Sequence, residues 1–362
     1  MSRANLVDRI AAFIERFVFI KDKQIYRLLA LWVIQTHFYK NFEFIGYVFA
    51  YSPEPESGKS RLLEVLRLLV ANPTEIENKP SDAVLFRTAD GMTQLLDEVD
   101  TWTNRESLRG ILNAGFHRDG AVQRMEERKE GGWKPVSFNV YAPRAMAGIG
   151  LGILHGTTRT RTFIILMVKQ KRAERREKFR SRKVKPEADQ LKAEIELWVK
   201  QNMQSVVELY DRAETAFPYL THLGDRTIDI VEPLAAILEV ACLEMNELNA
   251  RRMELLEAVS LVRKDGGEFV ADHRILQELA RLAARESPLV GSASELAARC
   301  ELDPRPDEYG IAGTLLRYGF ENRSIRRGDS VRYRYELARA QLAEICARFI
   351  SGQSEVGRVG GL

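Results

Sequence analysis

The sequence predicts an α/β fold whose core is a largely parallel β-sheet. Strand and helix patterns alternate between residues 45 and 168, which favours helices packed on a sheet because parallel strands need a crossover between them. Within this region, one apolar run enters the turn Ser57-Gly58-Lys59-Ser60. A second apolar run ends in the carboxylates Asp97 and Glu98.

The elements of this core follow from apolar spacing. Helical spacing across residues 3–40 predicts helices before the core, and residues 187–285 are predicted to be wholly helical after it. The strands and helices expected within the core are Tyr47–Tyr51, Arg61–Leu69, Thr93–Leu96, Leu108–Asn113, Val136–Tyr141, Ala145–Ile149 and Thr162–Val168.

The turn at residues 57–60 is typical of a phosphate-binding loop. In such loops, backbone N–H groups and a helix N-terminus face the anion, the lysine reaches the outer phosphates and the Ser hydroxyl holds magnesium. The usual first glycine of the motif would fall at position 53, which is Pro53 here. A Gly-Lys-Ser triplet also occurs by chance, so the loop needs a second motif beside it.

Met92–Asp100 supplies a candidate for that second motif, about forty residues downstream. An aspartate at the end of a strand, Asp97, can support the magnesium shell, and Glu98 can orient or deprotonate a water that attacks a γ-phosphate. The alternative is an acidic loop after a buried strand. The order of the two motifs along the chain favours a P-loop NTPase core, AAA+/RecA-like in its sheet.

Length, charge and cysteine content limit the kinds of protein that this sequence can form. With 362 residues, the chain exceeds one ordinary domain, and a formal charge of only +3 means that any contact with nucleic acid must be local. Cys242, Cys300 and Cys346 lie far apart without metal-ligand spacing, as in reduced core residues. The longest apolar stretch, Leu28–Ile34, is too short to cross a bilayer, and no signal peptide is visible. The sequence therefore predicts a cytoplasmic protein without membrane contact.

Two local basic segments are candidates for nucleic-acid contact. Residues 169–185 hold ten Lys or Arg against two Glu, which fits either a solvated face or a phosphate-backbone contact. Residues 293–297 and 311–318 predict two helices, and residues 324–335 predict two strands about a Gly-Asp turn. Helix, helix, hairpin, helix is the order of a winged helix. Its arginines fit nucleic acid or a solvated surface, and the candidate contacts are Arg326, Arg327, Arg332 and Arg334.

The chain resembles a family of P-loop ATPases of unassigned function from phages, plasmids and integrative elements, associated with primase and helicase modules. The resemblance spans about residues 20–350. In that family a Ser-Pro pair precedes the polar run of the phosphate loop, which accounts for Pro53. The matching segments are Tyr51–Glu64, Ala83–Arg87, Leu95–Asp100, Leu112–Ala121, Tyr141–Gly150, Thr157–Thr162, Glu177–Arg180, Asp225–Leu234 and the arginine-rich C-terminal hairpin.

The motifs and the resemblance together assign roles to residues. The amides of residues 57–60 and Lys59, with Arg61, are expected to bind ATP; Ser60 and Asp97 are expected to hold Mg²⁺. Glu98 is the candidate for polarising the attacking water. Other residues keep two possible roles. Asp100 would orient the second motif or cap a helix, and Asn113 would sense nucleotide or cap a helix. His117 and Arg118 also fit simple surface roles.

An arginine that reaches the γ-phosphate is also expected. The resemblance points to Arg161, acting in the same subunit or from a neighbour in a ring, with Arg159 as the rival if the alignment is shifted. An ion pair at the start of a strand is the alternative role of Arg161.

Five segments follow from these patterns. They are an N-terminal helical segment (1–44), a P-loop ATPase core (45–170), a helical domain with a basic linker (171–286), a winged-helix-like domain (287–352) and a disordered tail (353–362).

The function that the resemblance implies is ATP hydrolysis in a mobile genetic element, by a helicase-like or transfer-associated motor that acts on DNA as a ring or transient homo-oligomer. The alternative is a nucleotide-dependent switch that assembles and recruits a primase, helicase or defence partner without translocating. A nucleotide kinase is disfavoured because the sequence shows neither an acceptor-base pocket nor a lid signature.

Overall fold

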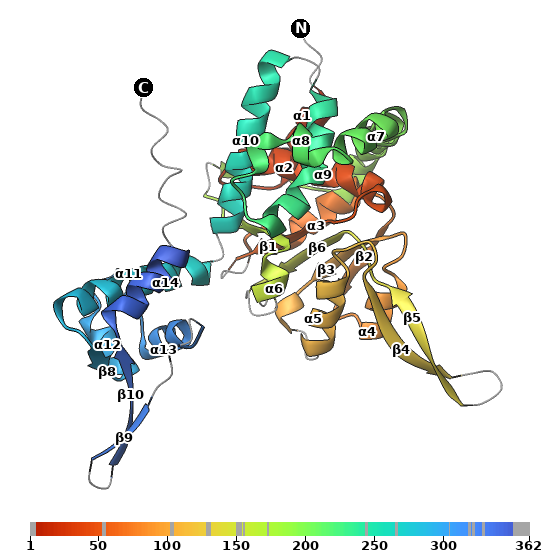
Figure 1. Cartoon of the computed structure of the whole chain (residues 1–362). Coiled ribbons are helices and arrows are strands. Elements are labelled where there is room, and N and C mark those ends of the chain that lie inside the picture. Colours follow the sequence, from red (N-terminus) through yellow and green to blue (C-terminus); the bar gives the residue numbers. More distant parts are fainter. Residues whose placement is uncertain are drawn as a thin grey trace. The chain divides into compact units, whose positions relative to one another are not determined.

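The computed structural model consists of two compact units, residues 1–265 and 266–362 (Figure 1). The first unit extends from the N-terminus to the end of helix α10, and the second begins with helix α11. The structure describes residues 5–52, 56–101, 105–127, 132–149, 154, 156–171, 174–242, 245–264, 267–303, 305–317, 320, 323–327 and 330–349. Pro53, His155, the Gly328-Asp329 turn and the C-terminal tail lie outside these ranges.

A five-stranded parallel sheet forms the centre of the first unit. Its strands lie in the order β2-β3-β6-β1-β7, and every neighbouring pair is parallel. This confirms the α/β core with a parallel sheet. The strands are β1 (Tyr47–Tyr51), β2 (Pro73–Asn78), β3 (Thr93–Asp97), β6 (Arg144–Gly148) and β7 (Thr162–Leu166).

The two faces of this sheet belong to two hydrophobic clusters, because successive side chains of a strand point to opposite faces. In β1, Val48 and Ala50 join the larger cluster, whereas Tyr47 and Phe49 join the smaller one. The larger cluster includes α3 (Lys59–Arg67), which follows the phosphate loop. The smaller cluster contains residues of α4 (Asp82–Arg87) and α5 (Arg105–Ala114).

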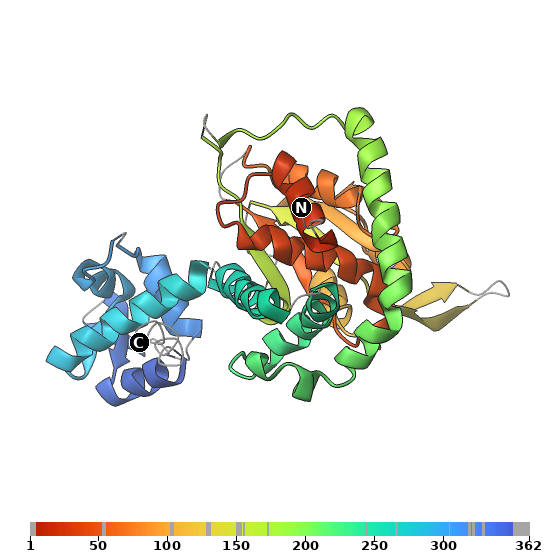
Figure 2. The same ribbon diagram turned by 90° about the horizontal axis from the view of Figure 1, so that it is seen from above.

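The N-terminal and later helices share the larger cluster (Figure 2). It combines α1 (Leu6–Phe17) and α2 (Gln24–Phe38) with α7 (Ser181–Tyr210), α9 (Asp225–Ala241) and α10 (Met245–Lys264). Each fully buried Leu, Ile or Phe contributes about 2 kcal/mol to this packing. Residues 1–44, 45–170 and 171–264 therefore pack as one unit, although apolar periodicity divides them into separate segments.

One expected core strand lies outside the sheet. Residues 136–139 belong to β5 (Trp133–Asn139), whose partner among the described strands is β4 (Ala121–Glu127), in an antiparallel hairpin. The strand expected at Val136–Tyr141 is therefore present over residues 136–139, but it lies outside the parallel sheet because its partner is a neighbour in sequence. Figure 1 shows the hairpin extending away from the sheet.

The second unit contains a three-stranded antiparallel sheet in the order β8-β10-β9. Its elements in chain order are α11 (Gly267–Arg285), β8 (Leu289–Gly291), α12 (Ala293–Arg299), α13 (Glu308–Arg317), β9 (Arg323–Arg327), β10 (Ser330–Leu337) and α14 (Arg339–Phe349). Both expected hairpin strands are present. Helix α11 shares the core of this unit through Leu276, Leu279 and Ala283, so the boundary lies near residue 265 rather than at 286.

Across the described ranges, no helix combines the length and the apolar character needed to span a membrane.

Candidate nucleotide-binding site

The phosphate loop connects the end of β1 to the start of α3. Gly58 is the N-cap of α3 with φ of 92°, a left-handed conformation that costs a residue with a side chain about 1 kcal/mol or more. Glu56 also has positive φ, at 58°. Gly58 leads directly into α3, whose first N–H groups have no carbonyl partner within the helix.

Lys59 and Ser60 are the first two residues of α3. The Lys59 ammonium group donates a hydrogen bond to Oγ of Ser57 at 3.2 Å, so its side chain turns back over the loop. Ser57 is buried, whereas Ser60 is exposed at the helix N-terminus. The loop thus presents a cation and a hydroxyl beside a helix N-terminus, the arrangement that binds phosphate.

Asp97 lies at the same edge of the sheet as this loop. Leu96 is level with Met146 of β6, and Met146 is level with Phe49 of β1. The next residue, Asp97, is therefore level with Ala50, one residue before the end of β1. Two strand spacings, about 10 Å, separate their backbones.

The carboxylate of Asp97 is nearly enclosed. The residue is only 8% exposed, and its Oδ1 accepts a hydrogen bond of 2.8 Å from the N–H of Glu98. Mg²⁺ takes one or two carboxylates together with phosphate oxygens and waters. A carboxylate on the same sheet edge as the Ser60 hydroxyl fits such an ion, which Ser60 and Asp97 would hold and which would neutralise phosphate charge.

Glu98 has a strained backbone and an exposed side chain. Its φ is 49°, and its carbonyl accepts hydrogen bonds from the N–H and the hydroxyl of Thr101 at 2.9 and 2.8 Å. A non-glycine residue in this conformation costs about 1–3 kcal/mol and is concentrated at functional sites. Glu98 directly follows the end of β3, at the edge that carries the loop. Asp100 follows in the short 3₁₀ turn Val99–Thr101.

A cavity of about 420 Å³ adjoins the phosphate loop. Its walls come from residues 56–61, from the segment between α1 and α2, and from residues 170 and 176–179. Its volume is within the range of small-molecule sites, about 300–1,000 Å³. The Arg61 guanidinium lies 4.7 Å from the centre of the Phe179 ring, which in turn packs edge-on against Phe17.

Sequence reasoning missed the aromatic wall of this cavity. Phe17 is the last residue of an amphipathic helix, so its apolar periodicity predicts only core packing. Phe179 lies in Glu177–Arg180, one of the segments that resemble the ATPase family, and this resemblance was the one sequence feature that pointed to it. Glu177 anchors this segment by accepting a 2.7 Å hydrogen bond from Nε of Arg16, and Arg16 holds the pKa of that carboxyl below its usual range.

The basic segment 169–185 is partly paired within the first unit. Lys169 forms an ion pair with Glu56 at 3.2 Å, and Arg176 forms one with Glu15 at 3.3 Å. Arg176 also lies 5.5 Å from the centre of the Phe19 ring, at the cavity wall. Lys169 therefore links the basic segment to the phosphate loop, and Arg176 links it to α1.

Arg161 lies at the opposite edge of the sheet from the loop. It directly precedes β7, and its carbonyl accepts a hydrogen bond from the N–H of Tyr47 at 3.0 Å, at the start of β1. The length of β7 places it about 17 Å from the carboxyl ends of the strands. The Arg161 backbone is therefore far from the phosphate loop of its own subunit.

Asn113 holds the Arg161 side chain. The Asn113 Oδ1 accepts a hydrogen bond of 3.0 Å from Nη1 of Arg161, and it also accepts hydrogen bonds from the hydroxyls of Thr157 and Thr158 at 3.1 and 2.9 Å. Asn113 is the penultimate residue of α5 and, through these contacts, lies at the same edge as Arg161. Arg159, which ends α6 (Gly156–Arg159), lies in the same turn.

Gly115 completes the Asn-x-Gly segment. A Cβ there would lie 2.3 Å from the carbonyl oxygen of Val140 and 2.4 Å from Nη1 of Arg144, so only glycine fits. His117 and Arg118 follow on the surface. Nε2 of His117 lies 3.1 Å from Glu43, which supports the surface role for this histidine.

The four candidate DNA-contacting arginines lie on the hairpin of the second unit. Arg326 and Arg327 end β9, and Arg332 and Arg334 lie in β10. Arg334 is paired with Glu295 at 2.9 Å, across to α12. Its charge is therefore partly neutralised within the protein.

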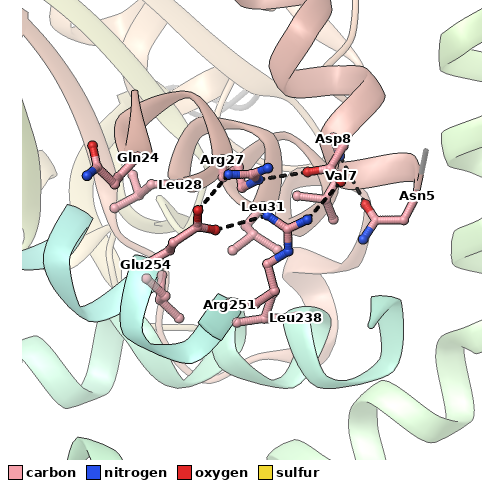
Figure 3. Close-up of a pocket in the computed structure, with 11 residues that line it drawn as sticks. Asn5, Val7, Asp8, Gln24, Arg27, Leu28, Leu31, Leu238, Arg251 and Glu254 are labelled. Carbon is pink, nitrogen blue, oxygen red and sulfur yellow. Dashed lines mark hydrogen bonds and ion pairs between the residues drawn. The ribbon is translucent and has the colours of Figure 1, made fainter. Parts of the chain in front are cut away.

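A second cavity, of about 20 Å³, lies between α1, α2 and α10 (Figure 3). Four side chains close it in a ring: Asp8 and Glu254 each accept hydrogen bonds from both Arg27 and Arg251, at 2.7 to 3.1 Å. Its volume suits about one water molecule. The ring joins three helices and has no room for a ligand.

The phosphate loop, the acidic strand end at the same edge and the order β2-β3-β6-β1-β7 define the core as that of a P-loop NTPase with an AAA+/RecA-like sheet. Residues 166–289, about a third of the chain, match the model of a family described as "Protein of unknown function (DUF3631)". This match confirms the resemblance to a family of unassigned function over that segment. No functionally curated protein matches the chain.

Three solved structures resemble the chain at low identity. A structure titled "SCCmec type IV Cch - active helicase" is 13% identical, with a TM-score of 0.40, covering 94% of this chain and 69% of that one. A point mutant of RuvB from Thermotoga maritima is 16% identical, with a TM-score of 0.29, covering 90% and 96%. The apo NrS-1 C-terminal region is 12% identical, with a TM-score of 0.34, covering 92% and 75%. With TM-scores below 0.5, these likenesses carry no argument about this chain.

Proposed function

We propose that the protein hydrolyses ATP at the loop formed by residues 57–60 and acts on DNA as part of a mobile genetic element. The observation that carries the ATPase is the position of Lys59 and Asp97 at one edge of the parallel sheet, with Glu98 exposed beside them. A cation, a magnesium-binding carboxylate and a second carboxylate are the groups that triphosphate hydrolysis requires.

In this proposal, the amides of residues 57–60 and Lys59 bind the β- and γ-phosphates. Arg61 and the aromatic side chains Phe17 and Phe179 border the space beside the phosphates, where a nucleoside would lie. Glu98 accepts hydrogen bonds from a water and orients it toward the γ-phosphorus.

Arg161 acts in a neighbouring subunit. Its position at the amino edge of the sheet removes it from the loop of its own chain, yet the guanidinium is held by Asn113 and by the carbonyl of Thr157, at 3.0 Å each. A head-to-tail assembly brings such an edge to the loop of the next copy. The protein is accordingly proposed to work as a ring or transient homo-oligomer.

The second unit is the proposed DNA-binding part. Its order of elements, with three antiparallel strands and an arginine-rich hairpin before the last helix, supports a winged-helix-like domain. Arginines that neutralise DNA phosphates provide affinity with little sequence preference. Recruitment of a primase or helicase partner without translocation is the second candidate, because a nucleotide-dependent assembly needs the same loop and the same Arg161.

The rate of ATP hydrolysis, with and without single- and double-stranded DNA, tests this function. We expect DNA to raise the turnover of the full chain and the Lys59→Ala variant to lose nucleotide binding or turnover. A turnover that ignores DNA of every form would reject the motor and leave the assembly switch. Wild-type turnover by Lys59→Ala would reject the nucleotide site itself.

A further inference from the structure

Two arginines from different elements meet at one aromatic ring on the far edge of the sheet. The guanidinium carbon of Arg161 lies 4.1 Å from the centre of the Phe116 ring, and that of Arg226 lies 5.7 Å from the same centre. Arg161 precedes β7, whereas Arg226 lies in the first turn of α9. The ring therefore brings a core arginine and a helical-segment arginine together.

The Phe116 ring, which both guanidinium groups contact, is held in place by packing. It is 5% exposed and stacks on Phe44 with ring centres 5.4 Å apart. The segment is also hydrogen-bonded to the sheet, since the carbonyl of Phe116 accepts from the N–H of Ile45 at 2.9 Å. Arg161 is held from the other side by Asn113.

The two arginines differ in their ion pairs. Arg226 donates a hydrogen bond to Oδ2 of Asp229 at 3.2 Å, but no described carboxylate forms an ion pair with Arg161. Burial and then the neighbouring Arg226 lower the pKa of Arg161. Asp229 lies near enough to act on Arg161 as well, and an anion that bridges the two guanidinium groups would relieve the repulsion between them.

The pair differs from the paired arginines elsewhere in the first unit. Arg27 and Arg251 share Asp8 and Glu254, so their charges balance within the ring of Figure 3. Arg226 keeps a side chain 54% exposed, so it is accessible to a ligand. An exposed guanidinium with one carboxylate partner keeps further N–H donors that suit a phosphate group.

We propose that Arg226 acts together with Arg161 on the terminal phosphate of a nucleotide bound to a second copy of this chain. The inference rests on the proposed function, because it assumes that Arg161 serves a neighbouring subunit. It adds that the helical segment supplies a second catalytic arginine, so that the receptor for the phosphate is built from two elements.

A mixing experiment with full-length subunits tests this role. Arg226→Ala keeps its own loop but lacks the second arginine, and Lys59→Ala keeps the arginine but lacks a working loop. Alone, each is expected to turn over ATP at least about tenfold more slowly than wild type, since removal of an arginine that reaches the transferred phosphate costs up to about 10⁵-fold. In an equimolar mixture, about a quarter of the head-to-tail interfaces pair an intact loop with an intact arginine, so about a quarter of the wild-type rate should return.

The control variants separate this inference from the proposed function. Arg161→Ala mixed with Lys59→Ala should also recover activity, and Arg212→Ala, at an exposed arginine of the same unit, should keep the wild-type rate. Recovery with Arg161→Ala but not with Arg226→Ala would overturn the inference alone. Recovery with neither would overturn action in a neighbouring subunit and the inference with it.

Folding of the variant is checked independently of turnover. Arg226→Gln keeps a hydrogen-bonding side chain beside Asp229 without the charge, and it should bind nucleotide as tightly as wild type while remaining slow. Wild-type turnover by Arg226→Gln and Arg226→Ala would also overturn the inference.

Discussion

Glu98 is held in a left-handed conformation directly after a buried strand. Local hydrogen bonds stabilise this conformation. The N–H of Glu98 donates to Oδ1 of Asp97, and the carbonyl of Glu98 accepts from the N–H of Thr101. This geometry leaves the carboxylate exposed at the sheet edge where Lys59 lies. Asp97 and Glu98 therefore have different environments although they are adjacent, one enclosed and one open to a water.

Glu98→Gln is expected to bind ATP but hydrolyse it about 100-fold or more slowly, since a side chain that accepts a proton contributes about 10²–10⁴-fold. The amide keeps the shape of the side chain and loses the negative charge. Single-turnover hydrolysis and nucleotide binding measured on one preparation check this. Equal turnover by Glu98→Gln and wild type would reject the assignment of the water-polarising residue.

At the scale of elements, the hairpin β9–β10 carries the proposed DNA contacts. Replacing Arg326, Arg327, Arg332 and Arg334 by Gln should weaken DNA binding and reduce the slope of log K against log salt by up to about 4, because each phosphate contact releases about one counterion. The measurement is a salt titration of DNA affinity. Arg334 should account for the smallest share, since it is already paired with Glu295.

The matched comparison is the exposed start of α7. Arg182, Lys183 and Lys185 belong to the basic segment 169–185 and are exposed. If their replacement by Gln reduces the slope and the hairpin variants do not, the contact lies on α7 and the winged-helix proposal fails.

Helices and strands were predicted correctly where the apolar pattern of a short segment is enough to define the element. The strands β1 and β3 and the helix after the loop follow from short apolar runs and their flanking turns. The hairpin β4–β5 was missed because an apolar run does not state which strand it pairs with. The burial of Arg144 was missed for a related reason. This arginine starts β6, has no exposed surface and donates hydrogen bonds to Gln94, Tyr47 and the carbonyl of Val140. None of these partners is charged, so no pattern of opposite charges in the sequence indicates that Arg144 is buried.

At the scale of the whole molecule, the loop and Arg161 lie at opposite edges of one sheet. In the proposed function, a single subunit therefore contains the phosphate loop and the arginine but cannot bring them to the same nucleotide. The rate of ATP hydrolysis per subunit should accordingly rise with protein concentration and reach a plateau once assembly is complete. Steady-state rates measured beside light scattering check this.

The control for assembly is Arg161→Ala, which should assemble yet remain slow at every concentration. A rate per subunit that is constant from dilute to concentrated wild type, with Arg161→Ala as active as wild type, would contradict catalysis at an interface between subunits.

The sequence alone predicted the turn before α3, the strand that ends in carboxylates and the alternation of the core, because these features depend on neighbouring residues. Only packing over long sequence distances decided the other features. The cavity wall from Phe17 and Phe179, the merging of residues 1–264 into one unit and the meeting of Arg161 with Arg226 at Phe116 all join residues that are far apart along the chain. Periodicity shows that a side chain is buried or charged, and the tertiary fold determines what it contacts.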